Sequence, residues 1–324
     1  MSDLKKRALG KSGLETAPLV FGGNVFGWTI DKAKSFEILD AFVGAGFNAI
    51  DTADVYSRWV PGNSGGESET IIGEWLKARR RRDDVLILTK VGSTMGQNGD
   101  DTRSDLSPRW IERAVEDSLR RLQTDVIDLY QSHWMDKTTP TEETLRAYER
   151  LIQTGKVRAI GASNHDAVRM REALDVAADK GLPRYETVQP HYNLYNRSTF
   201  EGEQQDLAVA EGLGVITYFS LESGFLSGKY GTVADADASK RGGGMLKDHF
   251  NERGVRILAV LDAVARRNEA TPAQVALAWL LSRPGVTAPI VSATSLDQLN
   301  DTLKAATLTL SVQDLADLTT ASDA

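Results

Sequence analysis

Four residues whose side chains suit acid–base chemistry stand at, or just after, the ends of short apolar runs. Asp51 and Tyr56 lie in IDTADVY, Lys90 ends VLILTK, and His133 follows IDLYQS. Continuously apolar runs are typical of buried parallel strands, so we expect the four side chains to meet at one rim. A nearby ammonium lowers the pKa of a phenol. The set predicts proton donation from Tyr56 to a carbonyl oxygen, with Asp51 pairing Lys90 and His133 orienting the oxygen.

Eight such runs alternate with amphipathic helical patterns along the chain. This alternation predicts an α/β fold, a (β/α)8 TIM barrel, formed as a single domain over residues 1–324. Segment 5–19 predicts an N-terminal hairpin at the bottom of the barrel, and segment 311–321 predicts a C-terminal helix. The predicted strands are 19–22, 48–51, 85–90, 126–131, 157–163, 187–189, 215–218 and 287–291.

The composition excludes several kinds of site. The 324 residues include no cysteine, which rules out disulfides, thiolate metal sites and cysteine nucleophiles. None of the four histidines pairs with another at metal-ligand spacing, so we expect no metal, and a metal-dependent barrel hydrolase is poorly supported. No G-x-G-x-x-G follows the first predicted strand, so a Rossmann dinucleotide site is not indicated.

The charge and hydropathy patterns also bear on partners. The net charge of −7 argues against nucleic acid as a partner. No apolar run approaches the ~20 residues of a membrane span, and no apolar signal-peptide core follows the N-terminus. We therefore expect a cytoplasmic protein with no membrane partner. The irregular segment 231–254 predicts either a lid over a bound ligand or a flexible insertion.

Five sequence blocks reveal a family resemblance. They are NAIDTADVYS, DVIDLYQSHWMDKTTPTEETLRAYERLIQTGKVRAIGASN, VQPHYNLYNR, GVITYFSLESGFLSGKY and TPAQVALAWLLSRPGV. Over nearly its whole length the chain resembles the aldo-keto reductases, NAD(P)H-dependent oxidoreductases on a TIM barrel. The resemblance implies that Asp51, Tyr56, Lys90 and His133 are the catalytic tetrad, and that a hydride moves between the nicotinamide and an aldehyde or ketone.

The resemblance also implies a cofactor site along the same rim. Ser163, Asn164 and Gln189 match residues that hydrogen-bond the carboxamide, and Tyr218 matches the aromatic residue that stacks on the nicotinamide. The segment from Leu221 to Lys229 resembles a pyrophosphate clamp, to which Ser227 also belongs. The cofactor-binding residues implied are Gly23, Asn24, Asp51, Ser163, Asn164, Gln189, Tyr218, Phe219, Ser220, Leu221, Ser223, Gly224, Gly228, Lys229, Ile290, Ser292, Thr294, Gln298, Asp301 and Thr302.

Two departures from the family pattern concern this site. Phe219-Ser220 stands where the family often has Ser-Pro, which predicts a reshaped loop. Ser292, Thr294 and Gln298 are neutral where many members carry Lys or Arg near a 2′-phosphate. We favour NADP(H), bound through hydroxyls at a helix N-terminus, with NAD(H) as the alternative.

The substrate side offers a small-molecule site. Trp28, Trp59 and Trp134 are expected to line a broad, apolar pocket for a carbonyl or alcohol substrate. A packing role is the alternative for Trp59 and Trp134. Two other functions stay open: an NAD-dependent alcohol or sugar dehydrogenase working in the oxidative direction, and a slow-turnover cofactor-binding regulatory subunit like the family's potassium-channel β-subunits.

Overall fold

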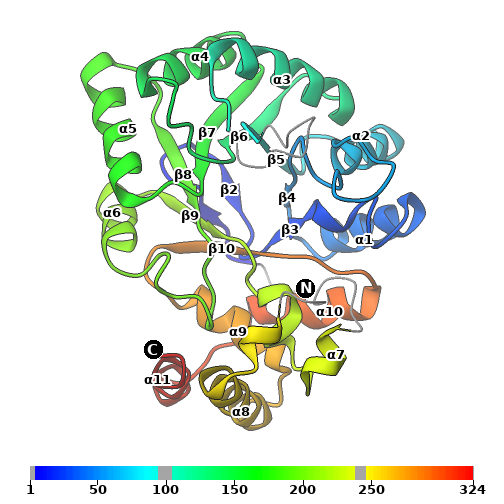
Figure 1. Ribbon diagram of the computed structural model, residues 1–324. Helices are drawn as coiled ribbons and strands as arrows, with labels where there is room; N and C mark the ends of the chain where they lie inside the picture. Colours follow the sequence, from blue (N-terminus) through cyan, green and yellow to red (C-terminus); the bar gives the residue numbers. More distant parts are fainter. Residues whose placement is uncertain (1–3, 94–103, 238–245, 324) are drawn as a thin grey trace.

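Eight parallel strands close into a barrel with helices around it (Figure 1). The computed structural model describes residues 4–93, 104–237 and 246–323. Neighbouring strands follow the order β10-β3-β4-β5-β6-β7-β8-β9, and each predicted run overlaps one of them, which confirms the (β/α)8 TIM barrel. The strands are β3 (Val20–Gly22), β4 (Ala49–Asp51), β5 (Leu86–Val91), β6 (Ile127–Ser132), β7 (Val157–Ser163), β8 (Tyr185–Gln189), β9 (Gly214–Thr217) and β10 (Val286–Val291).

Helices form the outer layer of the barrel. Capping residues start several of them: Asp31 accepts a hydrogen bond from the backbone of Lys34, and Ser107 precedes Pro108, as expected for a helix start. The helices are α1 (Lys32–Gly44), α2 (Glu67–Arg79), α3 (Pro108–Leu122), α4 (Thr141–Gln153), α5 (Ala167–Lys180), α6 (Glu203–Glu211), α7 (Val233–Asp237), α8 (Glu252–Arg267), α9 (Pro272–Leu281), α10 (Leu296–Leu303) and α11 (Val312–Ala321), with 3-10 turns η1 (Gly23–Val25), η2 (Glu222–Ser227), η3 (Lys247–His249) and η4 (Lys304–Ala306).

The N-terminal end of the barrel is closed by the predicted hairpin. Its strands β1 (Arg7–Ala8) and β2 (Glu15–Thr16) pair antiparallel. Leu9 and Leu14, both buried in the turn, belong to the same hydrophobic cluster as Leu88 and Leu129 from the barrel strands. Because this end is filled with side chains, ligand chemistry is left to the opposite rim.

The strand register places polar side chains in one layer inside the barrel, on the C-terminal side of this apolar cluster. Successive side chains in a strand point to opposite faces, so residues two apart share a face. Leu88 belongs to the interior cluster, and two residues on, Lys90 faces the same way beside its register partner Gln131. Ala49 and Asp51 of β4 repeat the pattern. A period of two therefore places the polar residues at the C-terminal ends of their strands on the inside.

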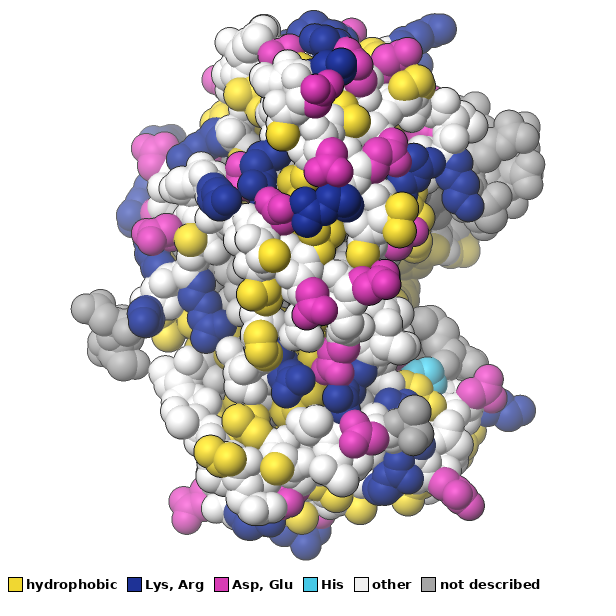
Figure 2. Space-filling model, turned by 90° about the vertical axis from the view of Figure 1, so that its left-hand side faces the viewer, with side chains coloured by type: hydrophobic (Ala, Val, Ile, Leu, Met, Phe, Trp, Pro, Cys, Tyr) yellow, Lys and Arg dark blue, Asp and Glu magenta, His cyan; other side chains and the backbone are white. Residues whose placement is uncertain are grey.

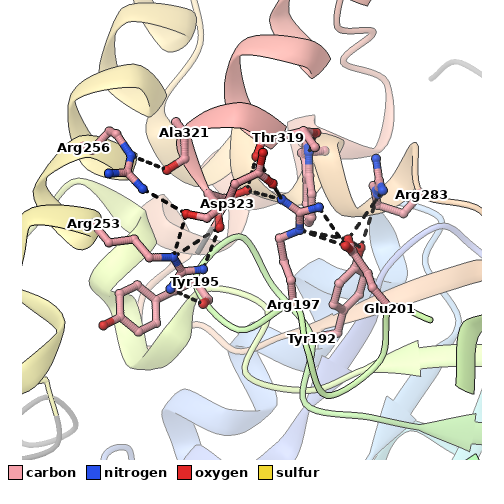
Figure 3. Close-up of polar contacts among 12 residues, drawn as sticks. Tyr192, Tyr195, Arg197, Glu201, Arg253, Arg256, Arg283, Thr319, Ala321 and Asp323 are labelled. Atoms are coloured by element: carbon pink, nitrogen blue, oxygen red, sulfur yellow. Dashed lines mark hydrogen bonds and ion pairs between the residues drawn. The ribbon is translucent and has the colours of Figure 1, made fainter. Parts of the chain in front are cut away.

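The chain's last helix is held by a cluster of arginines from other elements (Figure 3). Arg253 and Arg256, both on α8, donate to the backbone carbonyls of Ser322 and Ala321. Arg197 donates to the carbonyl of Thr319. The bonds to Ala321 and Ser322 satisfy carbonyls at the end of α11, and they hold the predicted C-terminal helix on α8.

The segment 231–254 contains α7 and η3. Residues 238–245 of this segment, where a lid or a flexible insertion was predicted, lie outside the described residues. In the part of the chain that the structure describes, no helix is both long and apolar enough to cross a membrane.

Candidate active site

Lys90 is the centre of the polar layer. Its side chain is only 1% exposed, yet its Nζ lies 2.5 Å from Asp51 Oδ1, 2.8 Å from the carbonyl oxygen of Thr52 and 2.9 Å from Tyr56 Oη. An ammonium has three donors and no acceptor, so these three contacts use it fully. The structure thus brings together three of the four predicted acid–base residues, with the ammonium donating to the phenol oxygen.

Asp51 is held on its other side by two buried amides. Gln189 and Gln131 donate to its Oδ2, at 2.9 Å and 3.2 Å. Sequence reasoning assigned Gln189 to the carboxamide and did not single out Gln131. Gln131 lies in β6 two residues before His133, but nothing in the local sequence indicates that its amide meets Asp51. Because both glutamines orient Asp51, its carboxylate is fixed toward Lys90.

Burial and neighbouring charge set the protonation of these groups. Burial alone would lower the pKa of Lys90, but Asp51 and Tyr56 outweigh it and raise that pKa, so the lysine stays charged. For Tyr56, burial raises the pKa more than Lys90 lowers it. The expectation that the ammonium lowers the phenol pKa therefore identifies a real effect but the wrong net direction. Tyr56 is the protonated phenol, which is the form that donates.

His133 completes the group on the side of the cavity. Its ring centroid lies 6.1 Å from that of Tyr56, and Nδ1 is buried without a hydrogen-bond partner among the described residues. Burial and the charge of Lys90 hold its pKa well below 6.5, so the imidazole is neutral. Its backbone carbonyl accepts from Asn164 Nδ2 at 2.9 Å. A neutral imidazole has one N–H to offer a substrate oxygen.

A cavity of about 520 Å³ opens on this rim, and Figure 2 shows the molecule hollowed at its right-hand edge. Of the predicted cofactor residues, all but two line it. Gly23 and Gly228 lie behind the wall instead, where an added Cβ would approach Ser68 or Pro272 too closely. Ser227, which was expected in the clamp segment, lines the cavity as well. Sequence reasoning missed three lining residues: Gly22, Ala273 and Val291. The glycine pair at Gly22 was a local signal, whereas nothing local marks the other two positions.

The predicted carboxamide-binding groups already form a network. Tyr218 Oη donates to Asn164 Oδ1 at 2.7 Å, and Ser163 Oγ donates to the carbonyl of Gln189 at 2.9 Å. In the described part of the chain no donor reaches Gln189 Oε1, although the residue lines the cavity. That amide oxygen is an acceptor for a ligand N–H, which fits a carboxamide.

Two glycines of the cavity wall are packed closely against neighbouring side chains. A Cβ on Gly22 would lie 2.7 Å from Ser292 Oγ, and one on Gly224 would lie 2.7 Å from Lys229 Nζ. A larger residue at either position would displace these side chains, so glycine preserves the shape of the wall. Lys229 lines the cavity beside Gly224, so its ammonium is available to an anionic ligand such as a diphosphate.

The far end of the cavity, by α10, is neutral or acidic. Thr294 donates its hydroxyl to Gln298 Oε1 at 2.9 Å. Asp301 accepts hydrogen bonds from Thr271 and Gln274. Among the described residues that line this end, none is a lysine or arginine. The hydroxyl-rich N-terminus of α10 is therefore the one positive feature offered here.

The comparison with known families decides how this arrangement is classified. The model of the aldo/keto reductase family matches residues 18–323. The chain belongs to the aldo/keto reductase family. It is an oxidoreductase of the kind that transfers hydride between a nicotinamide cofactor and a carbonyl compound.

Three similar proteins match most of this chain. An uncharacterized oxidoreductase, YrpG, of Bacillus subtilis (strain 168) is 35% identical over 93% of this chain and 91% of its own. Aldo-keto reductase dtxS3 of Metarhizium robertsii is 34% identical over 92% and 85%. A probable voltage-gated potassium channel subunit beta of Oryza sativa subsp. japonica is 33% identical over 93% and 91%. The match thus extends to proteins with different roles.

The tryptophans that were predicted to line the substrate pocket of this aldo-keto reductase are placed differently from one another. Trp59 and Trp134 line the cavity and are 43% and 47% exposed. Trp28 is absent from the lining and packs edge-to-face on Trp59, at a centroid distance of 5.5 Å. Trp134 stacks on His133. The two exposed rings offer an apolar border next to the acid–base group.

Proposed function

We propose that this aldo-keto reductase reduces an aldehyde or ketone, with Tyr56 as the general acid supported by Lys90, Asp51 and His133. One observation carries the proposal: a protonated phenol sits 2.9 Å from a buried, charged ammonium at the wall of the cavity. A positioned acid of this kind typically contributes 10²–10⁴-fold to a rate. In the oxidative direction, from alcohol to carbonyl, the same phenol accepts the proton.

Each residue has a distinct task in this reaction. Tyr56 gives its proton to the oxygen of the carbonyl as charge develops there, and the charge of Lys90 stabilises the phenolate that remains. Asp51 keeps Lys90 charged and oriented. The neutral His133 donates its N–H to the same oxygen and so orients the carbonyl carbon for attack.

The cavity residues fit a nicotinamide dinucleotide, which when bound supplies the hydride. Tyr218 would stack on the ring, and Gln189 and Asn164 would accept from the carboxamide. Lys229, beside Gly224, would hold the diphosphate. Trp59 and Trp134 exclude water from the carbonyl and select apolar substrates.

For the cofactor, NADP(H) is our first choice and NAD(H) our second. The N-terminus of α10, with Thr294 and the capping Ser295, offers hydroxyls and the helix dipole to a 2′-phosphate. The absence of Lys and Arg from the described lining at that end favours NAD(H). Asp301 beside the adenosine position also disfavours a dianion.

Two further proposals concern role and organisation. Similarity to a potassium channel subunit beta keeps open a regulatory function with slow turnover, which the same tetrad permits. Working as an alcohol or sugar dehydrogenase stays an alternative in the oxidative direction. We also propose that residues 1–324 form one domain, because the barrel strands extend from Val20 to Val291 and α11 packs on α8.

The first test joins binding to turnover. NADPH and NADH are each titrated into the protein by quenching of tryptophan fluorescence, and absorbance loss is then followed with a reactive aromatic aldehyde. In Tyr56→Phe we expect unchanged cofactor affinity with turnover reduced by about 10²–10⁴-fold. Tight binding with negligible turnover of any carbonyl by the wild type would instead favour the regulatory role. Binding of neither cofactor would refute the assignment.

A further inference from the structure

Glu222 is an acid in the middle of the loop that is assigned to an anionic diphosphate. Its neighbours Leu221 and Ser223 line the cavity, but Glu222 itself does not. Its φ of 44° is in the left-handed region, where an ordinary side chain is rarely found, and Phe219 and Ser223 share that conformation. The turn directs the carboxylate away from the cavity. A left-handed backbone conformation at non-glycine residues persists only where surrounding contacts hold it, and here the contacts of the Glu222 carboxylate do so.

Two histidines and an asparagine hold the carboxylate from two other segments. His191 Nε2, from the loop after β8, lies 2.7 Å from Glu222 Oε2, and Asn193 Nδ2 donates to the same oxygen. His249 Nε2, from η3, lies 3.0 Å from Glu222 Oε1. Burial would raise the pKa of Glu222, but these hydrogen bonds outweigh it and lower that pKa to about 2. The carboxylate is therefore ionised and ties three segments together.

The hydrogen bonds also fix which ring atoms carry protons. Asn196 Nδ2 donates to His191 Nδ1 at 3.0 Å, so that atom is the acceptor and Nε2 donates to Glu222. Direct nitrogen–oxygen bonds leave no space for an ion between these groups. In keeping with this, no group of three or more His, Asp or Glu in the described ranges is arranged to hold a metal ion. We define His191, Asn193, Glu222 and His249 as the Glu222 clasp.

The clasp reaches the cofactor site through stacked rings. His191 stacks on Tyr218, with centroids 5.3 Å apart and planes 26° apart, and it meets Phe219 edge-on. Tyr218 lines the cavity at the position assigned to the nicotinamide. Because Glu222 holds the imidazole of His191, it also holds the ring against which Tyr218 stacks.

On the other side, the clasp is anchored to the rim of the barrel by His249. The His249 ring stacks on Tyr195 at a centroid distance of 4.1 Å. Arg253 donates to the carbonyl of Tyr195 at 2.9 Å and to the C-terminal turn at Ser322, as Figure 3 shows for Tyr195. The stack on Tyr195 holds His249 independently of Glu222. Its hydrogen bond to Glu222 can therefore anchor loop 219–229.

We propose that Glu222 is a positioning residue for the bound nicotinamide cofactor: through His191 and His249 it holds loop 219–229 and the ring of Tyr218 in the cofactor-binding conformation. The inference rests on the proposed nicotinamide-dependent function. It predicts that loosening the clasp weakens cofactor binding mainly by speeding release, while the acid–base group around Tyr56 is untouched.

The experiment compares Glu222→Gln with Glu201→Gln. Glu201 is a matched glutamate that is ion-paired to Arg197 and hydrogen-bonded by Tyr192 in the arginine cluster of Figure 3, away from the cavity lining. Affinity for NADPH and NADH is measured by fluorescence quenching, release by stopped flow, and stability by thermal melting. We expect Glu222→Gln to weaken the better cofactor about tenfold, through faster release, because a charge-assisted bond is lost. Glu201→Gln should lose thermal stability and keep its cofactor affinity.

A second pair of variants guards against misfolding. His249→Leu removes a donor to Glu222, whereas His249→Gln retains one, so the first should weaken binding and the second should restore most of it. In steady state the cofactor KM should rise while kcat is not lowered. If affinity in Glu222→Gln and His249→Leu stays within twofold of wild type while melting falls as in the control, the clasp is only structural. If wild type binds neither cofactor, the proposed function fails and this inference with it.

Discussion

Two buried carboxylates of one barrel are neutralised in opposite ways. Near the N-terminal end, Asp128 accepts from Arg82 and Arg158, whose side chains are 21% and 52% exposed. Near the C-terminal end, Asp51 accepts from Lys90, which is 1% exposed. The two arginine side chains reach the protein surface, whereas Lys90 donates one of its hydrogen bonds to Tyr56 at the cavity.

The difference shows that a buried ion pair can take part in catalysis when one of its members also contacts a group that can transfer a proton. At Asp128 the remaining contact is the backbone N–H of Ile87, which donates to the carboxylate and is too weak an acid to transfer its proton to a ligand. At Asp51, the paired Lys90 also donates to the phenol oxygen of Tyr56. The N-terminal end of a TIM barrel serves stability and the C-terminal end serves catalysis. Variants at both ends test whether this separation holds.

The largest effect is expected from Lys90→Met. The change leaves Asp51 buried without its cation, which costs about 3–5 kcal/mol of stability, and it removes the ammonium that stabilises the phenolate. We expect reductive kcat to fall by about 10²–10⁴-fold, beyond any loss explained by unfolding. Rates and melting curves are measured together. Near-normal kcat in a folded variant would show that Lys90 serves structure only.

A stability loss without a catalytic one is expected from Asp128→Asn. The neutral amide leaves Arg82 and Arg158, which are partly exposed, without charge-assisted hydrogen bonds, so the free energy of unfolding should fall by about 1.5–3 kcal/mol. Urea unfolding measures this, and kcat/KM under native conditions should stay within twofold. A substantial fall in kcat/KM at unchanged stability would contradict the separation of the two ends.

A smaller effect is expected from Arg158→Ala at the same end. Half of this side chain is in solvent, and Arg82 remains to neutralise Asp128. Exposed pairs contribute about 0–1 kcal/mol, so unfolding free energy should change by less than about 1 kcal/mol. The comparison with Arg82→Ala is the control. Equal losses in the two variants would mean that exposure does not decide the strength of these pairs.

The smallest effect is expected from pH in the reductive direction. His133 is neutral because its pKa lies well below 6.5, and Tyr56 stays protonated because its pKa is raised above 10.0. Reductive kcat/KM should therefore be flat from about pH 7 to pH 10, and it should fall only as the phenol ionises. Oxidation, which needs the phenolate, should rise with pH over the same range. An inflection near pH 6.5 in both directions would assign a titrating role to His133.

Much of the fold and of the acid–base site could be predicted because its signals are local. Each strand is a short apolar run, and a polar residue at its C-terminal end must face the rim. Asp51 and Lys90 follow this rule in neighbouring strands, so their meeting was predictable. Gln131 was missed because an amide in a strand carries no signal of its partner. Gly22 and Val291 were missed because which strand-end residues face a cavity depends on twist and closure.

The net pKa shift of Tyr56 was less predictable than the position of its side chain. The effect of Lys90 on Tyr56 follows from residue types, but its competition with burial depends on how completely the rim covers the phenol. The sequence offers no measure of that burial, and the net direction of the Tyr56 pKa was wrong for this reason. The exclusion of Trp28 from the cavity lining has a similar origin, since Trp59 lies across its ring.

The sequence by itself determined the barrel, its closing hairpin and the set of strand ends that carry acid–base side chains, because periodicity and local motifs specify them. Only the tertiary structure decided which distant groups meet. His191 and His249 stand 31 and 27 residues from Glu222 and yet share its carboxylate. Contacts across such separations depend on how loops return over the rim, and no local pattern encodes them.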